Sequence, residues 1–307
     1  MIRMKIMITG IGGVGGYIAS ILCMHYPQVT LIARGERKNA LLRDGLRLYS
    51  DLLGTHCFHP AVTDTPAAAG VQDVLFVCVK NPSLAEALQA LQPCIGAHTV
   101  LCCIMNGVSY AQIAAQIFPH VPLVETCIYI TSAYEADYTI RQRGKYAHLY
   151  LGAATDVPHR QVLQILQHNG LKCTATPAIQ QEIWCKYILN CAYNVSTAYF
   201  KSDVAYIFSS PRRQNEFRLL LQEAAAVGRG LGIDLPFSIE ETIYNRVAAQ
   251  KDKTVTSSLA RDIRQGRAGE LETFSGYIVK TAAALGIPVP YSRKYYTTLQ
   301  EYCRTGA

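Results

Sequence analysis

The sequence predicts two domains: an α/β N-terminal domain built on a doubly wound parallel sheet, and an all-α C-terminal domain. Three observations support this fold class. Short apolar runs alternate with helix-like segments over residues 5–117, as in a parallel sheet with crossover helices. A glycine-rich turn follows the first apolar run. After about residue 170 the strand-like runs fade and helical periodicity dominates. We place the domains at residues 1–172 and 173–307.

The apolar runs set the expected order of elements. In the N-terminal domain, strands are predicted over residues 5–9, 29–33, 73–79 and 99–105, with helices over 14–24, 36–43, 82–91 and 110–117. The run Val74–Val79 is apolar at every position, as in a central parallel strand that is buried on both faces. Residues 121–152 instead predict antiparallel strands at the edge of the sheet. In the C-terminal domain, helices are predicted over residues 179–198, 211–231, 237–250 and 269–285.

The overall composition narrows the class of protein. Half of the 307 residues are hydrophobic and 17% are charged, which is typical of a globular protein long enough for two domains. The net charge is +7, but no long basic block alternates with aromatic residues, so we expect no nucleic-acid partner. No apolar run reaches the roughly 18 residues of a membrane span, and the N-terminus lacks the pattern of a signal peptide. These features favour a cytoplasmic protein without a membrane span.

Eleven cysteines are many for this length. They form no paired CxxC units and no His/Cys spacing typical of zinc, so we expect no bound metal. Most lie inside apolar runs, as Cys78, Cys102 and Cys103 do, where cysteine behaves as a small hydrophobic residue. The sequence therefore favours reduced cysteines with a structural role.

The glycine-rich turn carries the motif GxGxxG between the first predicted strand and the first predicted helix. Its positions are Gly10, Ile11, Gly12, Gly13, Val14 and Gly15. In such a turn the first glycine allows the tight bend and the second lets the backbone approach a pyrophosphate. The third lets helix and strand pack closely, and the helix N-terminus offers unpaired N–H groups to the anion. This placement predicts a Rossmann-type dinucleotide-binding domain. The alternative is a glycine-rich turn that binds no ligand.

The end of the second predicted strand indicates which dinucleotide is bound. NAD-specific sites usually place Asp or Glu about 20 residues after the glycines, where the carboxylate holds the ribose 2′-hydroxyl. Here Arg34 stands at that distance, and a planar guanidinium suits a 2′-phosphate. Glu36 is nearby and argues for NADH, but an acidic residue there also suits the first turn of the next helix. We therefore favour NADPH over NADH.

Polar residues also stand at other informative places. Lys80 and Asn106 follow two predicted strands, at the edge where open α/β sheets bind ligands. Each is also explained as a cap or a turn residue. Further along, Lys186, Asn190 and Asn194 repeat every four residues in a segment that is otherwise almost wholly apolar. A helix that is apolar all round is normally buried, so this narrow polar row indicates the lining of a site.

Together these residues resemble a known family. The motifs occur in the order of ketopantoate reductase (2-dehydropantoate 2-reductase): the glycines of residues 10–15, Arg34, Lys80, Asn106-Gly107, Trp184-Cys185-Lys186, Asn190, Asn194, Ser257-Ser258, Asp262 and Glu270. The resemblance covers almost the whole chain. It implies a Rossmann domain followed by a helical domain. It also implies NADPH-dependent reduction of 2-dehydropantoate to pantoate, on the route to pantothenate and coenzyme A.

The resemblance also implies roles for the C-terminal residues. Lys186 corresponds to the proton donor, Asn190, Asn194 and Ser258 to substrate-binding residues, and Glu270 to an acidic residue near both the cofactor and the reacting group. The chemistry agrees, because a cationic lysine can stabilise charge on a ketone oxygen during hydride transfer and then give that oxygen a proton.

From composition alone, the segment that contains Ser258, Asp262 and Glu270 reads as a solvated polar surface. Ser257 or Ser258 also suits the cap of the following helix. We interpret Asp262 as supporting rather than catalytic.

In the N-terminal domain, the resemblance implies that Asn106 touches both cofactor and substrate and that Lys80 lies near the cofactor. Two departures concern the substrate. The family often has an asparagine where this chain has Val255, and an Asn-Gly where it has residues 201–205. Another small 2-oxo acid is therefore an alternative substrate, and a non-catalytic NADPH-binding regulator is an alternative function. A homodimer through the C-terminal helices is possible.

Overall fold

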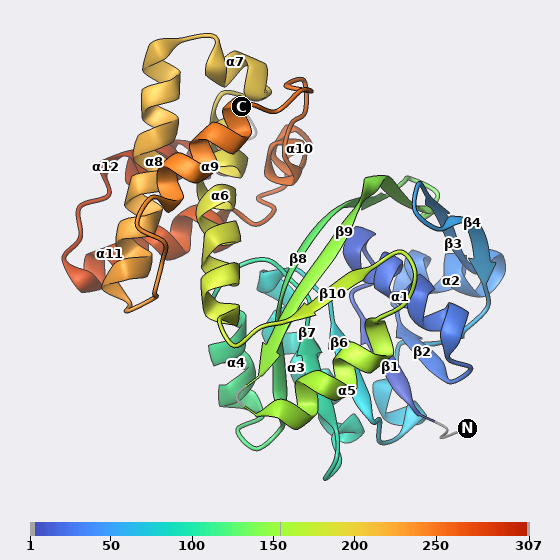
Figure 1. Ribbon diagram of the computed structural model, residues 1–307. Coiled ribbons are helices and arrows are strands. Elements are labelled where there is room, and N and C mark those ends of the chain that lie inside the picture. The colour runs from blue at the N-terminus through green and yellow to red at the C-terminus, as the bar shows by residue number, and fades with distance from the viewer. Residues whose placement is uncertain (1–3, 154, 306–307) are drawn as a thin grey trace. The chain divides into compact units, whose positions relative to one another are not determined.

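The computed structural model describes residues 4–153 and 155–305. The chain divides into two compact units, Met1–Ile179 and Gln180–Ala307, which we call unit 1 and unit 2 (Figure 1). Unit 1 is an α/β domain and unit 2 consists of helices, so the predicted fold class is confirmed. The division falls after Ile179, whereas the sequence predicts a boundary between residues 172 and 173.

Unit 1 is built on a 10-stranded sheet with the order β4-β3-β9-β8-β7-β6-β1-β2-β5, and β10 pairs with β9. The strands are β1 (Ile6–Thr9), β2 (Val29–Ile32), β3 (Leu46–Ser50), β4 (Gly54–Phe58), β5 (Ala61–Thr63), β6 (Val74–Val77), β7 (Val100–Cys103), β8 (Leu123–Tyr134), β9 (Ile140–Ala153) and β10 (Lys172–Ala175). Strands β7, β6, β1, β2 and β5 run parallel, and β8 and β9 form the predicted antiparallel pair.

Helices cover this sheet. The helices of unit 1 are α1 (Gly13–His25), α2 (Gly35–Asp44), η1 (Pro66–Ala69), η2 (Asn81–Ser83), α3 (Leu84–Leu91), η3 (Gln92–Cys94), α4 (Tyr110–Ile117) and α5 (Asp156–Leu166). Helices α1 and α5 pack against each other and against β8 and β9, while α3 packs against α4 (Figure 1). Apolar side chains of β1, β2, β6 and α1 form the centre of the core, since the strands are buried on both faces.

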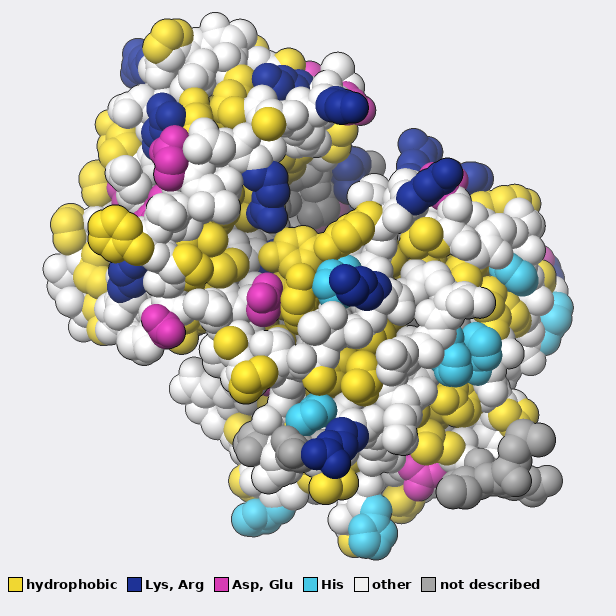
Figure 2. Space-filling view, viewed as in Figure 1, with side chains coloured by type: hydrophobic (Ala, Val, Ile, Leu, Met, Phe, Trp, Pro, Cys, Tyr) yellow, Lys and Arg dark blue, Asp and Glu magenta, His cyan; other side chains and the backbone are white. Residues whose placement is uncertain are grey.

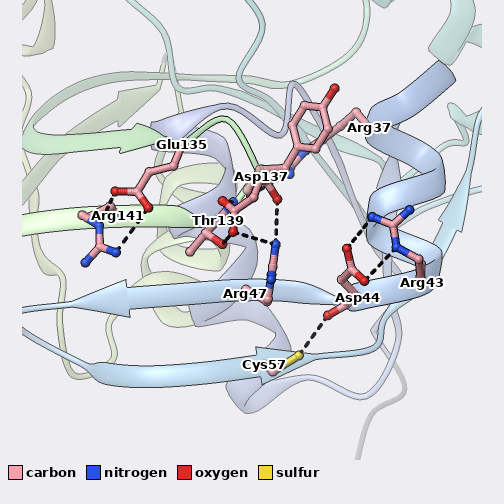
Figure 3. Close-up of polar contacts among 10 residues, drawn as sticks. Arg37, Arg43, Asp44, Arg47, Cys57, Glu135, Asp137, Thr139 and Arg141 are labelled. Carbon is pink, nitrogen blue, oxygen red and sulfur yellow. Dashed lines mark hydrogen bonds and ion pairs between the residues drawn. The ribbon is translucent and has the colours of Figure 1, made fainter.

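Strands β3, β4 and β5 were not predicted. They are short, and β4 and β5 are the two end strands of the sheet order. In β4 no residue is fully buried, and in β3 only Leu46 and Leu48 are. A strand at the edge of a sheet needs no apolar alternation, so its sequence carries little signal. The hairpin of β8 and β9 is tied to this edge, because Arg47 of β3 forms an ion pair with Asp137 (3.0 Å) and Arg37 of α2 donates to the carbonyl of Tyr138 (2.7 Å; Figure 3).

Unit 2 contains α6 (Ile179–Tyr199, which begins at the last residue of unit 1), α7 (Val204–Phe208), α8 (Pro211–Gly230), α9 (Ile239–Ala248), α10 (Ser258–Arg264), η4 (Glu272–Gly276, a π-helical turn), α11 (Tyr277–Leu285) and α12 (Pro290–Thr305). The chain's only tryptophan, Trp184, is 2% exposed and packs edge-on against Tyr187 of the same helix. A Cβ atom added to Gly228 of α8 would lie 2.8 Å from its ring, so the glycine allows α8 to approach α6 closely.

The two units differ in their titratable residues. All eight histidines precede residue 169, so unit 2 has none, and those visible in Figure 2 are spread over unit 1. Each of the eleven cysteines is a free thiol, and Cys57 is the exposed one. Within residues 4–153 and 155–305, no cluster of three His, Cys, Asp or Glu side chains is placed to hold a metal. None of the helices in this part of the chain is long and apolar enough to span a membrane.

Candidate functional site

The glycine loop of unit 1 lies where the parallel strand β1 meets helix α1. Gly10 has a φ of 85°, and a Cβ atom there would lie 2.4 Å from the carbonyl carbon of Cys78. At Gly15 a Cβ atom would lie 2.1 Å from the oxygen of Gly10. These two glycines are therefore required by the turn and by the close packing of strand, loop and helix.

Gly12 differs from its neighbours, because a Cβ atom there would meet no atom within 4 Å. The backbone at Gly12 therefore faces open space at the start of α1. Within the part of the chain that the structure describes, no side chain caps this helix end, and its first turn contains no acidic residue. A helix N-terminus in this state attracts an anion through its N–H groups and its dipole. The loop thus fits a pyrophosphate group.

The other residues predicted to bind the cofactor follow the neighbouring strands. Strands β7, β6, β1 and β2 are adjacent and parallel, so their carboxyl ends lie at one edge of the sheet. Asn106 follows β7, Lys80 follows β6, and Arg34 follows β2. The Asn81 side chain donates to the backbone oxygen of Asn106 (2.7 Å), which joins the loops after β6 and β7. The structure thus brings these residues and the glycine loop to the same edge.

Arg34 is the N-cap residue of α2, and Glu36 lies in the first turn of that helix, as predicted. The guanidinium of Arg34 forms an ion pair with Glu86 of α3 at 2.5 Å. Both side chains are exposed, at 58% and 69%, so water screens the pair and its contribution is small. This contact was not predictable from local sequence patterns, because the two residues are 52 positions apart.

The polar row of unit 2 lies on α6. Lys186, Asn190 and Asn194 share one face because they are spaced by four residues, and the flanks of the helix are buried and apolar. The side-chain amide of Asn194 donates to the oxygen of Asn190 (3.3 Å). The hydroxyl of Ser258 in turn donates to the side-chain oxygen of Asn194 (3.3 Å). Three of the predicted substrate-binding residues are therefore linked by hydrogen bonds within unit 2.

Ser257 has a different place from Ser258. It caps α10, since its hydroxyl oxygen accepts the N–H of Ala260 (3.0 Å) and the hydroxyl of Thr197 (2.7 Å). It also donates to the backbone oxygen of Asn194 (3.3 Å). The expectation that one of the two serines caps the following helix is confirmed for Ser257. This cap holds α10 against α6.

Asp262 and Glu270 are only 7% and 8% exposed, so the interpretation of these two residues as a solvated surface is wrong. Ser258, in contrast, is exposed. The carboxylate of Asp262 accepts two hydrogen bonds from the guanidinium of Arg267 (3.2 and 2.7 Å). The backbone N–H of Arg267 also donates to the backbone oxygen of Asp262 (2.9 Å), which closes the loop that leads to Glu270. This geometry supports the interpretation of Asp262 as a residue that shapes the loop. Glu270 stands two residues before the π-helical turn, which begins at Glu272.

Three residues that hydrogen-bond to the backbone near the candidate site residues were not predicted from the sequence. Tyr187 and Cys191 of α6 donate hydrogen bonds to the backbone of the π-helical turn, and Asn81 orders the loop at Asn106. In the sequence, Tyr187 and Cys191 read as ordinary apolar flank residues, since nothing local indicates a partner more than 80 positions away.

These features define a class of protein. An α/β unit with a glycine loop suited to a dinucleotide, followed by a helical unit with a lysine–asparagine row, is typical of a dinucleotide-dependent oxidoreductase. Comparison with family models then gives the family. Residues 6–156 match the model "Ketopantoate reductase PanE/ApbA", and residues 178–302 match "Ketopantoate reductase PanE/ApbA C terminal". The chain belongs to the ketopantoate reductase family, whose members are nicotinamide-dependent reductases.

Individual relatives agree with this family. The chain is 26% identical over 300 residues to a 2-dehydropantoate 2-reductase of Halobacterium salinarum. The aligned region covers 94% of this chain and 96% of that protein. Among solved structures, a PanE/ApbA family ketopantoate reductase from Ralstonia eutropha is similar, with a TM-score of 0.90 and 25% identity, over 98% of this chain and 99% of that one. D-mandelate dehydrogenase, solved with NADH and anilino(oxo)acetate, shares the fold at 18% identity (TM-score 0.88; 98% and 99% covered).

Proposed function

We propose that this protein catalyses the NADPH-dependent reduction of 2-dehydropantoate to pantoate, a step of pantothenate and coenzyme A biosynthesis. The observation that carries the proposal is the linked polar row of unit 2. Ser258, Asn194 and Asn190 form one chain of hydrogen bonds beside Lys186, on a helix that is otherwise apolar. Helix stability does not explain such a row, because asparagine is a poor helix former. Membership in the family adds the reaction type.

In this proposal unit 1 holds the cofactor. The N–H groups at the start of α1, beside Gly12, bind the pyrophosphate, and Ile11, Gly13 and Val14 complete the loop around it. Arg34 binds the 2′-phosphate that distinguishes NADPH from NADH. Lys80 and Asn106, at the carboxyl ends of β6 and β7, lie along the same edge of the sheet. When bound, NADPH supplies the hydride for the reaction.

Unit 2 supplies the remaining chemistry. As the ketone is reduced, negative charge grows on its oxygen, and the ammonium of Lys186 stabilises that charge. Lys186 then gives its proton to the oxygen as general acid, which leaves a hydroxyl group on the product. Asn190, Asn194 and Ser258 position the hydroxy acid with neutral hydrogen bonds. The carboxylate of Glu270 keeps the lysine protonated and binds the new hydroxyl.

Two other functions compete with this one. A different small 2-oxo acid is favoured by the departures at Val255 and residues 201–205; Val255 is 40% exposed, and its carbonyl accepts from the hydroxyl of Tyr193 (3.3 Å). The similarity to D-mandelate dehydrogenase points in the same direction. A non-catalytic NADPH-binding regulator would need only unit 1. The homodimer and the cytoplasmic location stay predictions.

The deciding experiment is steady-state kinetics of the purified protein with a panel of 2-oxo acids and NADPH. We expect the highest kcat/KM for 2-dehydropantoate. A clear preference for another 2-oxo acid would assign that substrate instead. The absence of turnover with every member of the panel, together with tight NADPH binding, would favour the regulator.

A second experiment tests the proton donor. Lys186→Ala is expected to lower kcat by about a hundredfold or more while NADPH binding persists, because the loss of a general acid affects the chemical step. The matched control is Lys251→Ala, since Lys251 is an exposed lysine of the same unit. Full activity in Lys186→Ala would refute the mechanism.

A further inference from the structure

The helix that follows Glu270 begins with an irregular turn. Residues Glu272–Gly276 are π-helical, and the N–H of Tyr277 donates to the oxygen of Glu272, five residues before it. In an α-helix the same N–H would donate to Thr273. The wider turn therefore leaves the Thr273 carbonyl without its usual backbone donor. π-turns of this kind are frequent at functional sites.

Side chains of α6 donate to the carbonyls of this turn. The hydroxyl of Tyr187 donates to the oxygen of Thr273 at 2.6 Å and to that of Phe274 at 3.2 Å. The thiol of Cys191 donates to the oxygen of Phe274 at 3.4 Å. Tyr187 is only 1% exposed, so an unpaired carbonyl at this place would be costly. These hydrogen bonds connect the π-turn to α6.

The position of these donors relates them to the proposed catalytic row. Tyr187 follows Lys186 directly, and Cys191 follows Asn190 directly, so each donor is the chain neighbour of a residue of the row. At the other end, the N–H of Phe274 donates to the backbone oxygen of Glu270 (3.1 Å). Residues 270–274 therefore receive hydrogen bonds from α6 and include Glu270, whose carboxylate belongs to the proposed site.

We propose that Tyr187, assisted by Cys191, is a positioning residue that clamps the π-turn to α6 and thereby fixes the Glu270 carboxylate relative to Lys186. This rests on the proposed function of those two residues. Tyr187 acts through the backbone and touches no reacting atom. Burial raises the pKa of the Tyr187 hydroxyl well above its usual value, so the group stays a proton donor throughout the range of assay pH.

A purely structural role is the competing explanation, and a matched variant separates the two. Tyr295 is also a buried tyrosine of unit 2, and its hydroxyl donates to Glu216 at 2.5 Å. Tyr295→Phe removes a buried hydroxyl whose partner, Glu216, belongs to α8. Tyr187→Phe removes the clamp. Both variants are to be assayed well below their unfolding temperatures, with 2-oxo acid and NADPH.

For Tyr187→Phe we expect kcat to fall about tenfold, since small displacements of a positioned group reduce turnover strongly, with the KM for NADPH unchanged. The alkaline limb of the kcat profile moves to lower pH, because a carboxylate that lies farther away stabilises the Lys186 ammonium less. Amide exchange over residues 273–278 becomes faster. Tyr295→Phe keeps kcat within about twofold, and Cys191→Ser, which retains a donor, does the same.

The outcomes distinguish the two proposals. If the wild-type protein reduces no 2-oxo acid, the proposed function fails; faster amide exchange in Tyr187→Phe then still supports the clamp itself, and unchanged exchange overturns it. If the wild-type protein is active, a kcat and pH profile for Tyr187→Phe that match those of Tyr295→Phe overturn the positioning role.

Discussion

The candidate binding features of unit 1 and those of unit 2 are of different kinds. In unit 1 the key features are backbone: a glycine loop, the uncapped start of α1, and the ends of four parallel strands. In unit 2 they are side chains on helices, joined by hydrogen bonds through Asn190, Asn194 and Ser258. A backbone site depends on the absence of Cβ atoms, whereas a side-chain site depends on donors and acceptors that are held in place.

The difference extends to acid–base chemistry. Every histidine belongs to unit 1, so unit 2 has no imidazole to act as proton donor. Lys186 is the cation of the polar row on α6, which agrees with its proposed role. In the proposed function, this difference assigns the anionic cofactor to unit 1 and the proton transfer to unit 2.

The largest expected effect concerns the backbone site. In Gly15→Ala the new Cβ atom would lie 2.1 Å from the oxygen of Gly10, which belongs to the backbone and cannot move aside. We expect the free energy of unfolding to fall by about 2 kcal/mol, together with a loss of NADPH binding. Thermal unfolding and fluorescence titration with NADPH measure the two quantities.

Gly12→Ala is the matched variant for that experiment, since its Cβ atom meets nothing within 4 Å. We expect its unfolding free energy to change by less than about 1 kcal/mol. NADPH binding should nevertheless weaken by about tenfold, because the methyl group occupies the place of the pyrophosphate. Normal binding in Gly12→Ala would contradict the assignment of the loop.

A second pair of variants tests the side-chain site. Ser257→Ala removes the cap of α10 and a partner of Thr197, so it should cost about 1 kcal/mol of unfolding free energy. Ser258→Ala removes only the hydrogen bond to Asn194, and should raise the KM for the 2-oxo acid with little change in stability. Chemical denaturation and steady-state kinetics are the measurements. The reverse pattern would exchange the two roles.

A smaller effect is expected at the ion pair between Arg34 and Glu86. Glu86 competes with a 2′-phosphate for the guanidinium, so Glu86→Gln should raise the preference for NADPH over NADH. An exposed pair is worth at most about 1 kcal/mol, which limits the gain to about fivefold. The ratio of kcat/KM for the two cofactors measures it. Arg34→Gln serves as the opposite control, and an unchanged ratio there would remove Arg34 from cofactor selection.

The smallest effect concerns acid stability, which should differ between the units. Burial lowers the pKa of His148 and His168 from 6.5, so the unfolded chain binds protons more readily than the folded one. The free energy of unfolding of unit 1 therefore decreases as the pH falls below about 6.5. In unit 2, burial opposes ionisation of Glu216, but hydrogen bonds from Tyr295 and Arg212 hold its pKa below 4.5. Its contribution is lost only at pH values below about 4.5.

Amide exchange of the full-length protein, corrected for intrinsic rates, checks this order. On acidification from pH 7.5 to about 5.5, protection should decrease in unit 1 and persist in α8 and α12, which carry Glu216 and Tyr295. Loss of protection in unit 2 first would contradict the prediction.

Local patterns in the sequence were enough for the glycine loop and for the polar row of α6, because each is a short periodic motif. The same holds for the buried parallel strands. Contacts between distant segments were not predictable: the pair Arg34–Glu86 joins residues 52 positions apart. The π-turn after Glu270 was also missed, and its partner Tyr187 on α6 is 86 positions from Thr273 in the sequence. Short exposed strands such as β4 have no apolar alternation to detect.

The single tryptophan has a practical consequence. Trp184 lies two positions before Lys186, is 2% exposed, and has tyrosine rings at 5.3 and 6.5 Å between centroids. Trp184 is the only indole of the 307-residue sequence, so tryptophan emission reports on α6. Rearrangement of that helix, whether by a ligand or by a substitution, is therefore visible in the intrinsic fluorescence without any attached dye.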